Sequence, residues 1–287
     1  MKSIGVIGHG FVGTAVDEGM QHAFKVEVYD KAKGFRAGKQ FSVLDNPYER
    51  IVKYTDGPIF VCVPTPMQSS GACDTSIVED VVLTLNEVAL KLDQTRTVVI
   101  KSTVVPGTTD SLNERCPHLH VCFNPEFLRE ASSVEDFKNQ DRIIIGGPHA
   151  GTKVLKEMYQ KSFPDVPTTK THSTIAEMVK YVTNCFLATK VSFANEIKQV
   201  CDALDIDYDK VVEYATKDDR LGSSHWAVPG PDGFVGFGGK CFCKDLNALM
   251  FKSNELGVAV DTMKGAWSKN LEVRPEKDWE SIDGVIS

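Results

Sequence analysis

Cys241 stands in the string GFVGFGGKCFCKD, residues 233–245, where glycines precede it and Lys244 and Asp245 follow it closely. A cysteine reacts as the thiolate, which a nearby ammonium group and the backbone amides of a glycine loop favour. Such a sulfur can attack a carbonyl carbon and hold a covalent intermediate. The string therefore predicts a reactive Cys241, with a cysteine packed inward as the alternative. For neighbouring Cys243 the structural interpretation is favoured.

Two further pairs of polar residues have a spacing of four. Lys180 and Asn184 would project from one face of a helix, where they could donate to an oxyanion that develops on a substrate. Glu126 and Glu130 lie in NPEFLRE and could supply a general base. Solvated surface residues are the alternative for both pairs. Thr103 follows a predicted strand, where doubly wound folds place ligand contacts, although a turn residue before a proline is the simpler interpretation.

The first strand is followed by a glycine fingerprint, Gly8-His-Gly10-Phe-Val-Gly13. Asp30 closes the second predicted strand, where a carboxylate can accept hydrogen bonds from the ribose hydroxyls of a dinucleotide. The glycines permit a tight turn and a close approach of the pyrophosphate to a helix N-terminus. An acidic residue at this position favours NAD over NADP.

These residues need a scaffold, and the chain predicts an α/β fold for its first half. Helical patterns alternate there with short runs rich in valine and isoleucine, which are typical of buried strands in a doubly wound, Rossmann-like parallel sheet. The runs are SIGVIG, KVEVYD, IFVCVP, TVVIKS, HVCFN and RIIIGG. Asp74 can cap the helix that follows it.

After about residue 165 the pattern changes to helices. Residues 173–206 predict one long helix that begins at Ser173 or Thr174 and is apolar on more than one face. Another helix is expected from about Asp245, and the last stretch, 274–287, is expected to be a surface tail. We therefore expect an NAD-binding Rossmann-like domain at 1–165 and an α-helical substrate and dimerisation domain at 166–287.

Composition limits the partners. The 287 residues are 42% hydrophobic and 25% charged, which is typical of a globular protein. A net charge of −7 argues against binding to nucleic acid or to an acidic membrane. No apolar run is long enough to cross a bilayer, and the N-terminus lacks an export signal. We expect a cytoplasmic protein with reduced cysteines and, from their scattered spacing, no metal site.

Seven motifs, in this order, make the chain similar to the UDP-glucose/GDP-mannose dehydrogenase family. They are GxGxxG, VPTP, KSTVVPGT, NPEFLREAS, KYVTNCFLA, DDRLG and GFGGKCFCKD, and they run from residue 5 to about 250. NPEFLRE and GFGGxCxxKD together are highly specific. Cys243 stands where the family has a proline, and Lys240 where it commonly has a serine. The family usually has a third, C-terminal domain that helps to hold UDP, and the sequence ends before it.

The resemblance implies an NAD-dependent, four-electron oxidation of UDP-glucose to UDP-glucuronate, in which the C6 alcohol becomes a carboxylate. Cys241 would form a thiohemiacetal and then a thioester. Asp245 would orient a water or accept a proton, and Lys180 and Asn184 would stabilise oxyanions. Other nucleotide sugars of the same family, such as GDP-mannose, are alternative substrates.

Hydrolysis of the thioester would use Glu130, with Thr103 positioning the water, and Glu126 is the competing base. The residues expected to bind NAD are Gly8, Gly10, Phe11, Val12, Gly13, Asp30, Thr65, Thr103, Glu130 and Lys244. Those expected to bind the sugar nucleotide are Glu126, Phe127, Leu128, Arg129, Lys180, Asn184, Arg220, His225, Phe237 and Gly238.

The long helix is expected to build a homodimer, in which Arg220 reaches the substrate of the neighbouring subunit. Two other classes remain as alternatives. A two-electron hydroxyacid dehydrogenase also pairs a Rossmann domain with a helical domain, but it has no use for the Cys241 loop. A catalytically silent protein that binds NAD or a sugar nucleotide is the other alternative, against which the complete set of candidate catalytic residues argues.

Overall fold

A computed structural model describes residues 1–37, 41–42, 46–282 and 284–286. Contacts divide the chain into two units. Unit 1 comprises Met1–Thr65 and Asp74–Lys180, and unit 2 comprises Pro66–Cys73 and Tyr181–Ser287. The border falls inside the long helix α7 (Ser173–Ala203), not at residue 165. It lies there because the first turns of α7 pack against unit 1, where the side chain of Ala176 belongs to the core.

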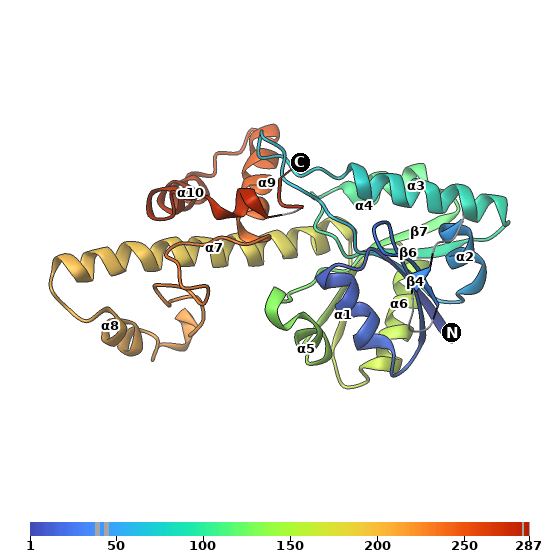
Figure 1. Ribbon diagram of the computed structural model, residues 1–287, viewed down its shortest axis with the longest axis horizontal. Coiled ribbons are helices and arrows are strands. Elements are labelled where there is room, and N and C mark those ends of the chain that lie inside the picture. The colour runs from blue at the N-terminus through green and yellow to red at the C-terminus, as the bar shows by residue number, and fades with distance from the viewer. Residues whose placement is uncertain (38–40, 43–45, 283, 287) are drawn as a thin grey trace. The chain divides into compact units, whose positions relative to one another are not determined.

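Unit 1 is built on one sheet, in which the described residues form nine strands in the order β4-β3-β2-β1-β5-β6-β7-β8-β9 (Figure 1). Their bounds are β1 (Ser3–Ile7), β2 (Lys25–Asp30), β3 (Gly34–Ala37), β4 (Phe41–Ser42), β5 (Ile59–Val61), β6 (Arg96–Ile100), β7 (Leu119–Phe123), β8 (Ile143–Gly146) and β9 (Thr168–Thr171). The five central strands, from β2 to β7, pair in parallel. This confirms the predicted Rossmann-like α/β class.

All six predicted runs form strands, but the sheet is mixed. β8 pairs antiparallel with β7, and β3 pairs antiparallel with β2. The strands β3, β4 and β9 were not predicted. They are short and partly polar, so they lack the continuous valine and isoleucine pattern that marks a buried parallel strand.

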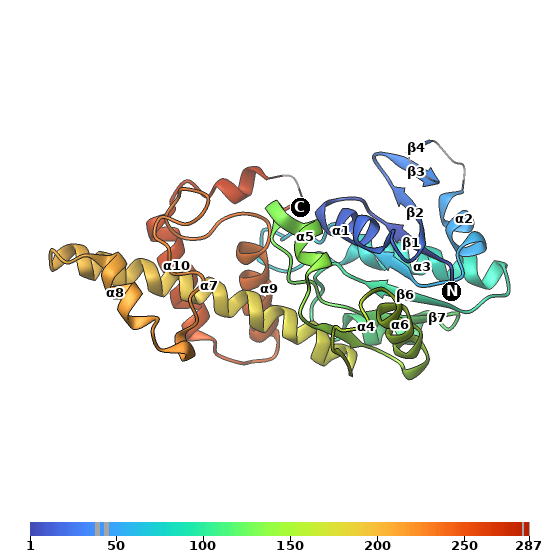
Figure 2. The same cartoon turned by 90° about the horizontal axis from the view of Figure 1, so that it is seen from below.

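Helices cover both faces of the sheet (Figures 1 and 2). α2 (Pro47–Tyr54), α3 (Ser76–Lys91) and α4 (Thr108–Arg115) share one apolar cluster, and α1 (Phe11–Met20), α5 (Ser133–Lys138) and α6 (His149–Ser162) share the other. Neighbouring strand residues alternate between the clusters, as Phe60 and Val61 do on β5. The carboxyl ends of the parallel strands therefore meet at one edge, where such folds bind ligands.

Unit 2 is helical. The second part of α7 packs with α9 (Phe242–Glu255) and α10 (Asp261–Val273), and α8 (Tyr208–Ala215) follows α7 in the chain (Figure 2). Short 3₁₀ turns lie at η2 (Asp219–Leu221) and η3 (Asp278–Ser281) here, and at η1 (Glu130–Ser132) in unit 1. The buried hydroxyl of Ser192 on α7 donates to the carbonyl oxygen of Ala266 on α10 over 2.7 Å. None of the helices described combines the length and apolar character needed to cross a bilayer.

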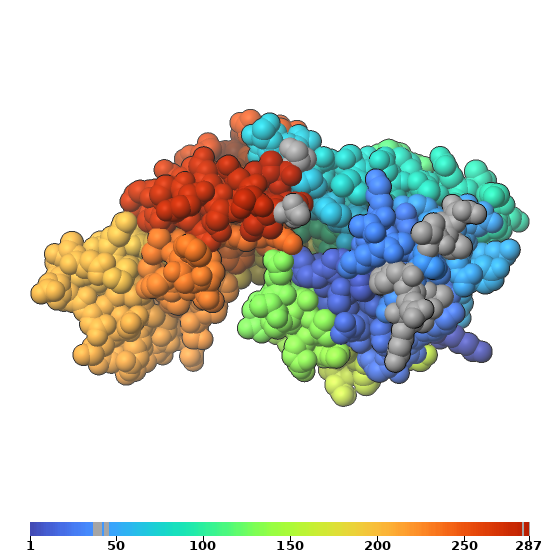
Figure 3. Space-filling model, in the orientation of Figure 1, coloured from blue at the N-terminus to red at the C-terminus, as the bar shows by residue number. Residues whose placement is uncertain are grey.

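The segment after α10 is packed, and the expected surface tail is wrong. Trp279 and Val285 are buried, and the Trp279 ring lies 5.5 Å from that of Trp267 between centroids. The Met67 amide donates to the Val285 carbonyl oxygen, also within unit 2. Figure 3 shows the red residues of this segment as part of the continuous surface of unit 2. Its many charged residues suggested a solvated tail, but two apolar side chains anchor it.

Candidate active site

The glycine fingerprint joins β1 to α1 as expected. Gly8 has φ +87°, and a Cβ on it would lie 2.5 Å from the carbonyl oxygen of Cys62. A Cβ on Gly13 would collide with the carbonyl oxygen of Gly8. α1 begins directly at Phe11 and no side chain caps it, so its first amides face the turn. A helix N-terminus of this kind suits a pyrophosphate.

Asp30 is held in place at the end of β2 by backbone amides. One carboxylate oxygen accepts the His9 amide at 2.7 Å, and the other accepts the amides of Ala32 and Lys33. Partial burial raises the pKa of Asp30, but these hydrogen bonds outweigh it and the net pKa is lowered. An ionised carboxylate beside the fingerprint is the group that an NAD ribose requires.

Glu126 and Lys180 form a buried ion pair in unit 1. The Lys180 ammonium donates to a carboxylate oxygen of Glu126 and to its backbone carbonyl oxygen, each at 2.7 Å. The other carboxylate oxygen accepts the amide of Leu128 at 2.8 Å. Burial raises the pKa of Glu126, but Lys180 and this amide outweigh it, so the pKa is lowered and the group is held ionised.

Behind this pair lies a second buried cation that the sequence interpretation missed. Lys101, just beyond β6, donates to Asn124 Oδ1 at 3.1 Å, and the Tyr159 hydroxyl donates to the same oxygen at 2.5 Å. Burial lowers the pKa of Lys101 to about 8, although Glu126 opposes the shift. The available signal was position, because Lys101 and Asn124 directly follow strands in two of the quoted motifs.

The remaining candidates of unit 1 differ in exposure. Thr65 and Thr103 are buried, whereas Glu130 is exposed on η1. Arg129 pairs with Asp136 through its guanidinium and its own amide. Phe127 lies under the guanidinium of Arg142 at 4.3 Å, and Leu128 packs against the apolar cluster of α1, α5 and α6.

In unit 2 the carboxylate of Asp245 lies between two donors. Asn184 Nδ2 donates to one oxygen at 2.6 Å, and the Lys244 ammonium contacts the other. Asp245 is buried on the first turn of α9. Burial lowers the pKa of Lys244, but the charges of Asp245 and Cys241 outweigh it and raise the pKa well above the usual value. Lys244 is therefore a fixed cation beside the cysteine.

The two cysteines of the loop have different surroundings. Cys241 is partly exposed and is the N-cap of α9, so its sulfur lies at the positive end of that helix. Cys243 is fully buried, its thiol contacts the Phe237 carbonyl oxygen at 3.7 Å, and burial raises its pKa. Geometry thus separates a thiol suited to chemistry from one that packs.

The other substrate candidates of unit 2 lie in the loop between α8 and α9. Arg220 has a side chain that is 89% exposed, and it pairs with Asp218. His225 has φ +65°, and burial lowers the pKa of its ring. Trp226 is half-buried, and its indole donates to the Gly222 carbonyl oxygen at 2.9 Å. Phe237 is buried and both of its backbone groups are already bonded.

The structure thus divides the candidates predicted from the sequence into two groups, one in each unit. Thr103, Glu126 and Lys180 belong to unit 1, and Asn184, Cys241 and Asp245 to unit 2. α7 carries residues of both groups, with Lys180 and Asn184 one turn apart. Over the residues described, no cluster of histidine, cysteine, aspartate or glutamate is arranged to hold a metal ion.

A doubly wound sheet with a dinucleotide fingerprint, followed by a helical unit, is the arrangement expected of the NAD-dependent dehydrogenase class. The pattern of the NAD binding domain of the UDP-glucose/GDP-mannose dehydrogenase family matches residues 36–163, and that of the family's central domain matches residues 174–272. The chain belongs to this family, and NAD is its cofactor.

Curated relatives and a solved structure agree with this assignment. UDP-glucose 6-dehydrogenase TuaD of Bacillus subtilis is 32% identical over 309 residues, which cover 96% of this chain and 64% of that protein. A GDP-mannose 6-dehydrogenase of Pseudomonas syringae is 30% identical over 250 residues, 83% of this chain and 55% of that protein. The structure of a UDP-glucose dehydrogenase from Pyrobaculum islandicum matches with a TM-score of 0.84 and 31% identity, over 95% of this chain and 68% of that one. This chain therefore spans about two thirds or less of the length of these relatives.

Proposed function

We propose that this protein oxidises the C6 alcohol of UDP-glucose to a carboxylate, giving UDP-glucuronate, in two NAD-dependent steps. The observation that carries the proposal is the environment of Cys241. Cys241 is the N-cap residue of α9, and Lys244 lies in the first turn of the same helix. The Lys244 ammonium pairs with the carboxylate of Asp245, which also accepts a hydrogen bond from Asn184. An oxidation that stopped at the aldehyde would need a base but no nucleophile.

In the first oxidation the substrate hydroxyl loses a proton and C6 loses a hydride, which NAD, when bound, accepts in each of the two steps. Asp245 accepts the proton or orients the water that carries it away. Lys180 and Asn184 are the donors proposed to stabilise the negative charge on the substrate oxygen. The buried surroundings of these side chains strengthen such electrostatic contacts.

In the second oxidation the Cys241 sulfur forms a bond to the aldehyde carbon, and the carbonyl oxygen becomes the hydroxyl of a thiohemiacetal. Loss of a hydride from that carbon and of the hydroxyl proton leaves a thioester. Water then attacks the thioester carbon, the C–S bond breaks, and the thiolate of Cys241 leaves. Glu130 is proposed to take the proton of the water that Thr103 positions. Glu126 is the weaker candidate, because Lys180 and the Leu128 amide already hold its carboxylate.

The nucleotide sugar itself is the open choice within the family, because a GDP-mannose 6-dehydrogenase is also similar to this chain. A panel of UDP-glucose, GDP-mannose and UDP-N-acetylmannosamine, followed by NADH absorbance, tests the choice. We expect the highest kcat/KM with UDP-glucose and two NADH for each sugar. A higher value with another sugar would replace the substrate, and no NADH with any of them would favour the silent binding protein.

The role of Cys241 has a direct test. Cys241→Ser should lower the steady-state rate by at least about a hundredfold, because an alkoxide leaves an ester less readily than a thiolate leaves a thioester. Cys201→Ala, which removes a buried thiol from α7, is the matched control and should keep the wild-type stoichiometry. Two NADH per sugar at near the wild-type rate in Cys241→Ser would contradict the mechanism.

We further propose a homodimer built on α7. Four exposed apolar side chains of unit 2 follow spacings of four and seven residues, so they lie on one face of this helix; they are Val182, Phe186, Phe193 and Val200. A contiguous apolar surface of this kind is typical of a subunit interface. Arg220, which is almost fully exposed, is proposed to complete the substrate site of the neighbouring subunit.

A reducing compartment such as the cytoplasm fits the cysteines. Six of the eight cysteines are buried. Disulfides would be expected to form and persist in an oxidising compartment. Fractionation of cells that express a tagged protein tests this proposal, and we expect the protein in the cytoplasmic fraction.

A further inference from the structure

The glycine loop before Cys241 is held by α10. Asn270 Oδ1 accepts the amide of Phe237 at 2.7 Å, and Asn270 Nδ2 donates to the carbonyl oxygen of the same residue at 2.9 Å. Asn270 is fully buried. A shift of the loop would leave a buried donor and a buried acceptor without partners, which is unfavourable. This pair of hydrogen bonds therefore fixes both the place and the orientation of Phe237.

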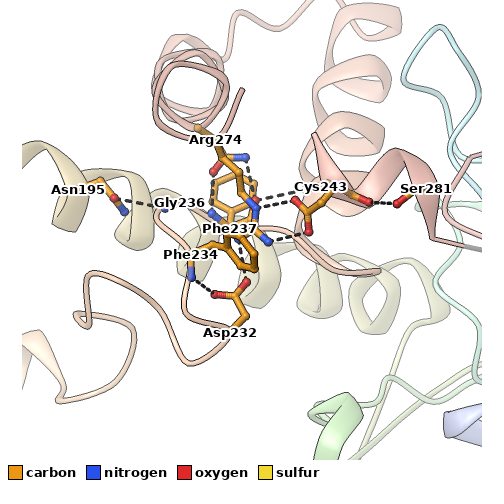
Figure 4. A network of polar contacts seen from close by, with 10 residues as sticks. Asn195, Asp232, Phe234, Gly236, Phe237, Cys243, Arg274 and Ser281 are labelled. Carbon is orange, nitrogen blue, oxygen red and sulfur yellow. Dashed lines mark hydrogen bonds and ion pairs between the residues drawn. The ribbon is translucent and has the colours of Figure 1, made fainter. Parts of the chain in front are cut away.

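Arg274, one turn further along, also contacts this loop (Figure 4). Its guanidinium donates to both carboxylate oxygens of Asp278, at 2.6 and 2.7 Å, and to Asp232 at 2.8 Å. Asp232 also accepts the amide of Phe234, whose ring lies 5.0 Å from the guanidinium. The Arg274 side chain is 3% exposed, so a buried fork joins the loop to the turn after α10.

Two glycines of the loop are required by this contact. A Cβ on Gly236, which has φ +70°, would lie 2.5 Å from Asn270 Oδ1, and a Cβ on Gly238 would lie 2.5 Å from Arg274 Nη2. For Gly236 and Gly238 the nearest groups belong to α10. Gly239 differs, because a Cβ there would meet nothing within 4 Å.

Backbone groups of Gly236 and Phe237 also tie the loop to α7 and α9. The carbonyl oxygen of Phe237 contacts the Cys243 thiol in the first turn of α9, and Asn195 on α7 accepts the amide of Gly236 at 3.3 Å (Figure 4). Only residues 238–240 separate the fixed Phe237 from Cys241. The cysteine is thus held on its N-terminal side by the loop and on its C-terminal side by α9.

We infer that Asn270 and Arg274 are positioning residues, which set the place of the Cys241 sulfur by holding the glycine loop against α10. The inference rests on the nucleophilic role proposed for Cys241. Neither residue touches substrate in this assignment. Their effect should appear in the step that needs the sulfur, and not in the first hydride transfer or in the binding of NAD, which belongs to the fingerprint of unit 1.

Asn270→Asp tests the inference with almost no change in volume, because a carboxylate oxygen replaces the amide group that donates to Phe237. In single turnovers we expect the first NADH at the wild-type rate and the second slowed at least about tenfold, as a displaced nucleophile requires. The KM for NAD should stay within about twofold. Equal slowing of both steps would show general damage, and no slowing of the second would show that the contact is dispensable. Either result overturns the inference.

Glu272→Gln is the matched control, since Glu272 lies on α10 between the two residues but is exposed. It should leave both steps at the wild-type rate. Arg274→Lys provides a second variant if Asn270→Asp does not fold by circular dichroism. It keeps the charge but loses the planar fork, and the same slowing of the second step is expected.

A rescue experiment isolates the contact itself. Gly238→Ala should slow the second NADH at least about tenfold, because its methyl group meets Arg274. Arg274→Ala removes that obstacle, so adding Gly238→Ala to it should cause no further loss. An equal loss from Gly238→Ala in both backgrounds would show that Arg274 is not the reason for the glycine.

A readout without substrate separates this inference from the proposed function. Alkylation of Cys241 by iodoacetamide is measured by mass spectrometry of the peptide 241–244. Asn270→Asp and Arg274→Lys should change its rate at least about threefold, since the reactivity of a thiol depends on its surroundings. An unchanged rate overturns the inference. A changed rate in a protein that oxidises no nucleotide sugar would retain the positioning and reject the function.

Discussion

At the scale of single residues, charge pairing decides which groups are available for chemistry. The sequence could not choose between Glu126 and Glu130 as the hydrolytic base, because both lie in NPEFLRE. The structure buries Glu126 against Lys180 and leaves Glu130 exposed on η1. A carboxylate that is already bonded to a cation and an amide is a weak base, so these contacts argue against Glu126 as the hydrolytic base.

Lys180→Met should lower the free energy of unfolding by about 3–5 kcal/mol at pH 7, because it leaves Glu126 as an unpaired buried charge. The folded protein holds the pKa of Glu126 below its ordinary value of 4.5. Its contribution is therefore present above pH 4.5 and is lost as the pH falls through the lowered pKa. Urea denaturation of the wild type and of Lys180→Met should show that the difference between their free energies of unfolding becomes smaller toward pH 4.

The double variant Glu126→Gln/Lys180→Met is the control for this prediction. Removing both charges should recover at least about half of the loss, since neither member of the Glu126–Lys180 pair then remains as a lone buried ion. A difference between wild type and Lys180→Met that does not depend on pH would contradict the assignment.

At the scale of elements, α7 is anchored in unit 1 by one carboxylate. Glu177, which is fully buried, accepts the Gly107 amide at 2.7 Å, the Thr109 amide at 2.9 Å and the Thr109 hydroxyl at 2.6 Å. These donors form the N-terminus of α4, so a residue of α7 caps another helix. The anchor places Lys180, one turn further on, next to Glu126.

Glu177→Ala should lower the free energy of unfolding by about 2–4 kcal/mol, because it leaves three buried donors without an acceptor. Glu196→Ala, at an exposed position of the same helix, should change it by no more than about 0.5 kcal/mol. Urea denaturation at pH 7 measures both. A loss for Glu177→Ala as small as that for Glu196→Ala would show that solvent replaces the cap.

At the scale of the whole molecule, the exposed apolar face of α7 indicates assembly. Phe186 is 66% exposed in the single chain, and Val182 is 55% exposed. Apolar residues scattered singly over a surface are common, but a row along one helix face is typical of an interface. The proposed occupant is the same face of a second copy, as in a symmetric dimer.

Phe186→Glu should convert a dimer into a monomer, because a charge at the centre of an apolar interface loses its hydration. Light scattering at assay concentration measures the mass. Leu90→Glu, on α3 and 57% exposed, is the control and should leave the mass unchanged. A wild-type protein that is a fully active monomer would refute the assembly. We expect lower activity in Phe186→Glu, since Arg220 would no longer reach a partner.

Local sequence patterns predict much of the fold and many of the candidate site residues. The buried strands and the long helix follow from periodicity, because their apolar residues recur at the spacing that one buried face requires. The fingerprint Gly8 to Gly13 with Asp30 predicts the NAD site, since each glycine and the acid serve a local turn or strand end. The residues of the cysteine loop could also be singled out from their types alone.

Only the tertiary structure showed which of these residues are hydrogen-bond or ion-pair partners. The partner of Glu126 is 54 residues away along the chain, and Asn184 and Asp245 are separated by 61. Neither separation follows from a local pattern. The short polar strands β3, β4 and β9 and the burial of Trp279 likewise depend on neighbours that the sequence does not place. The two glycines beside Asn270 and Arg274 show the same limit, because the group that excludes a side chain there comes from a distant helix.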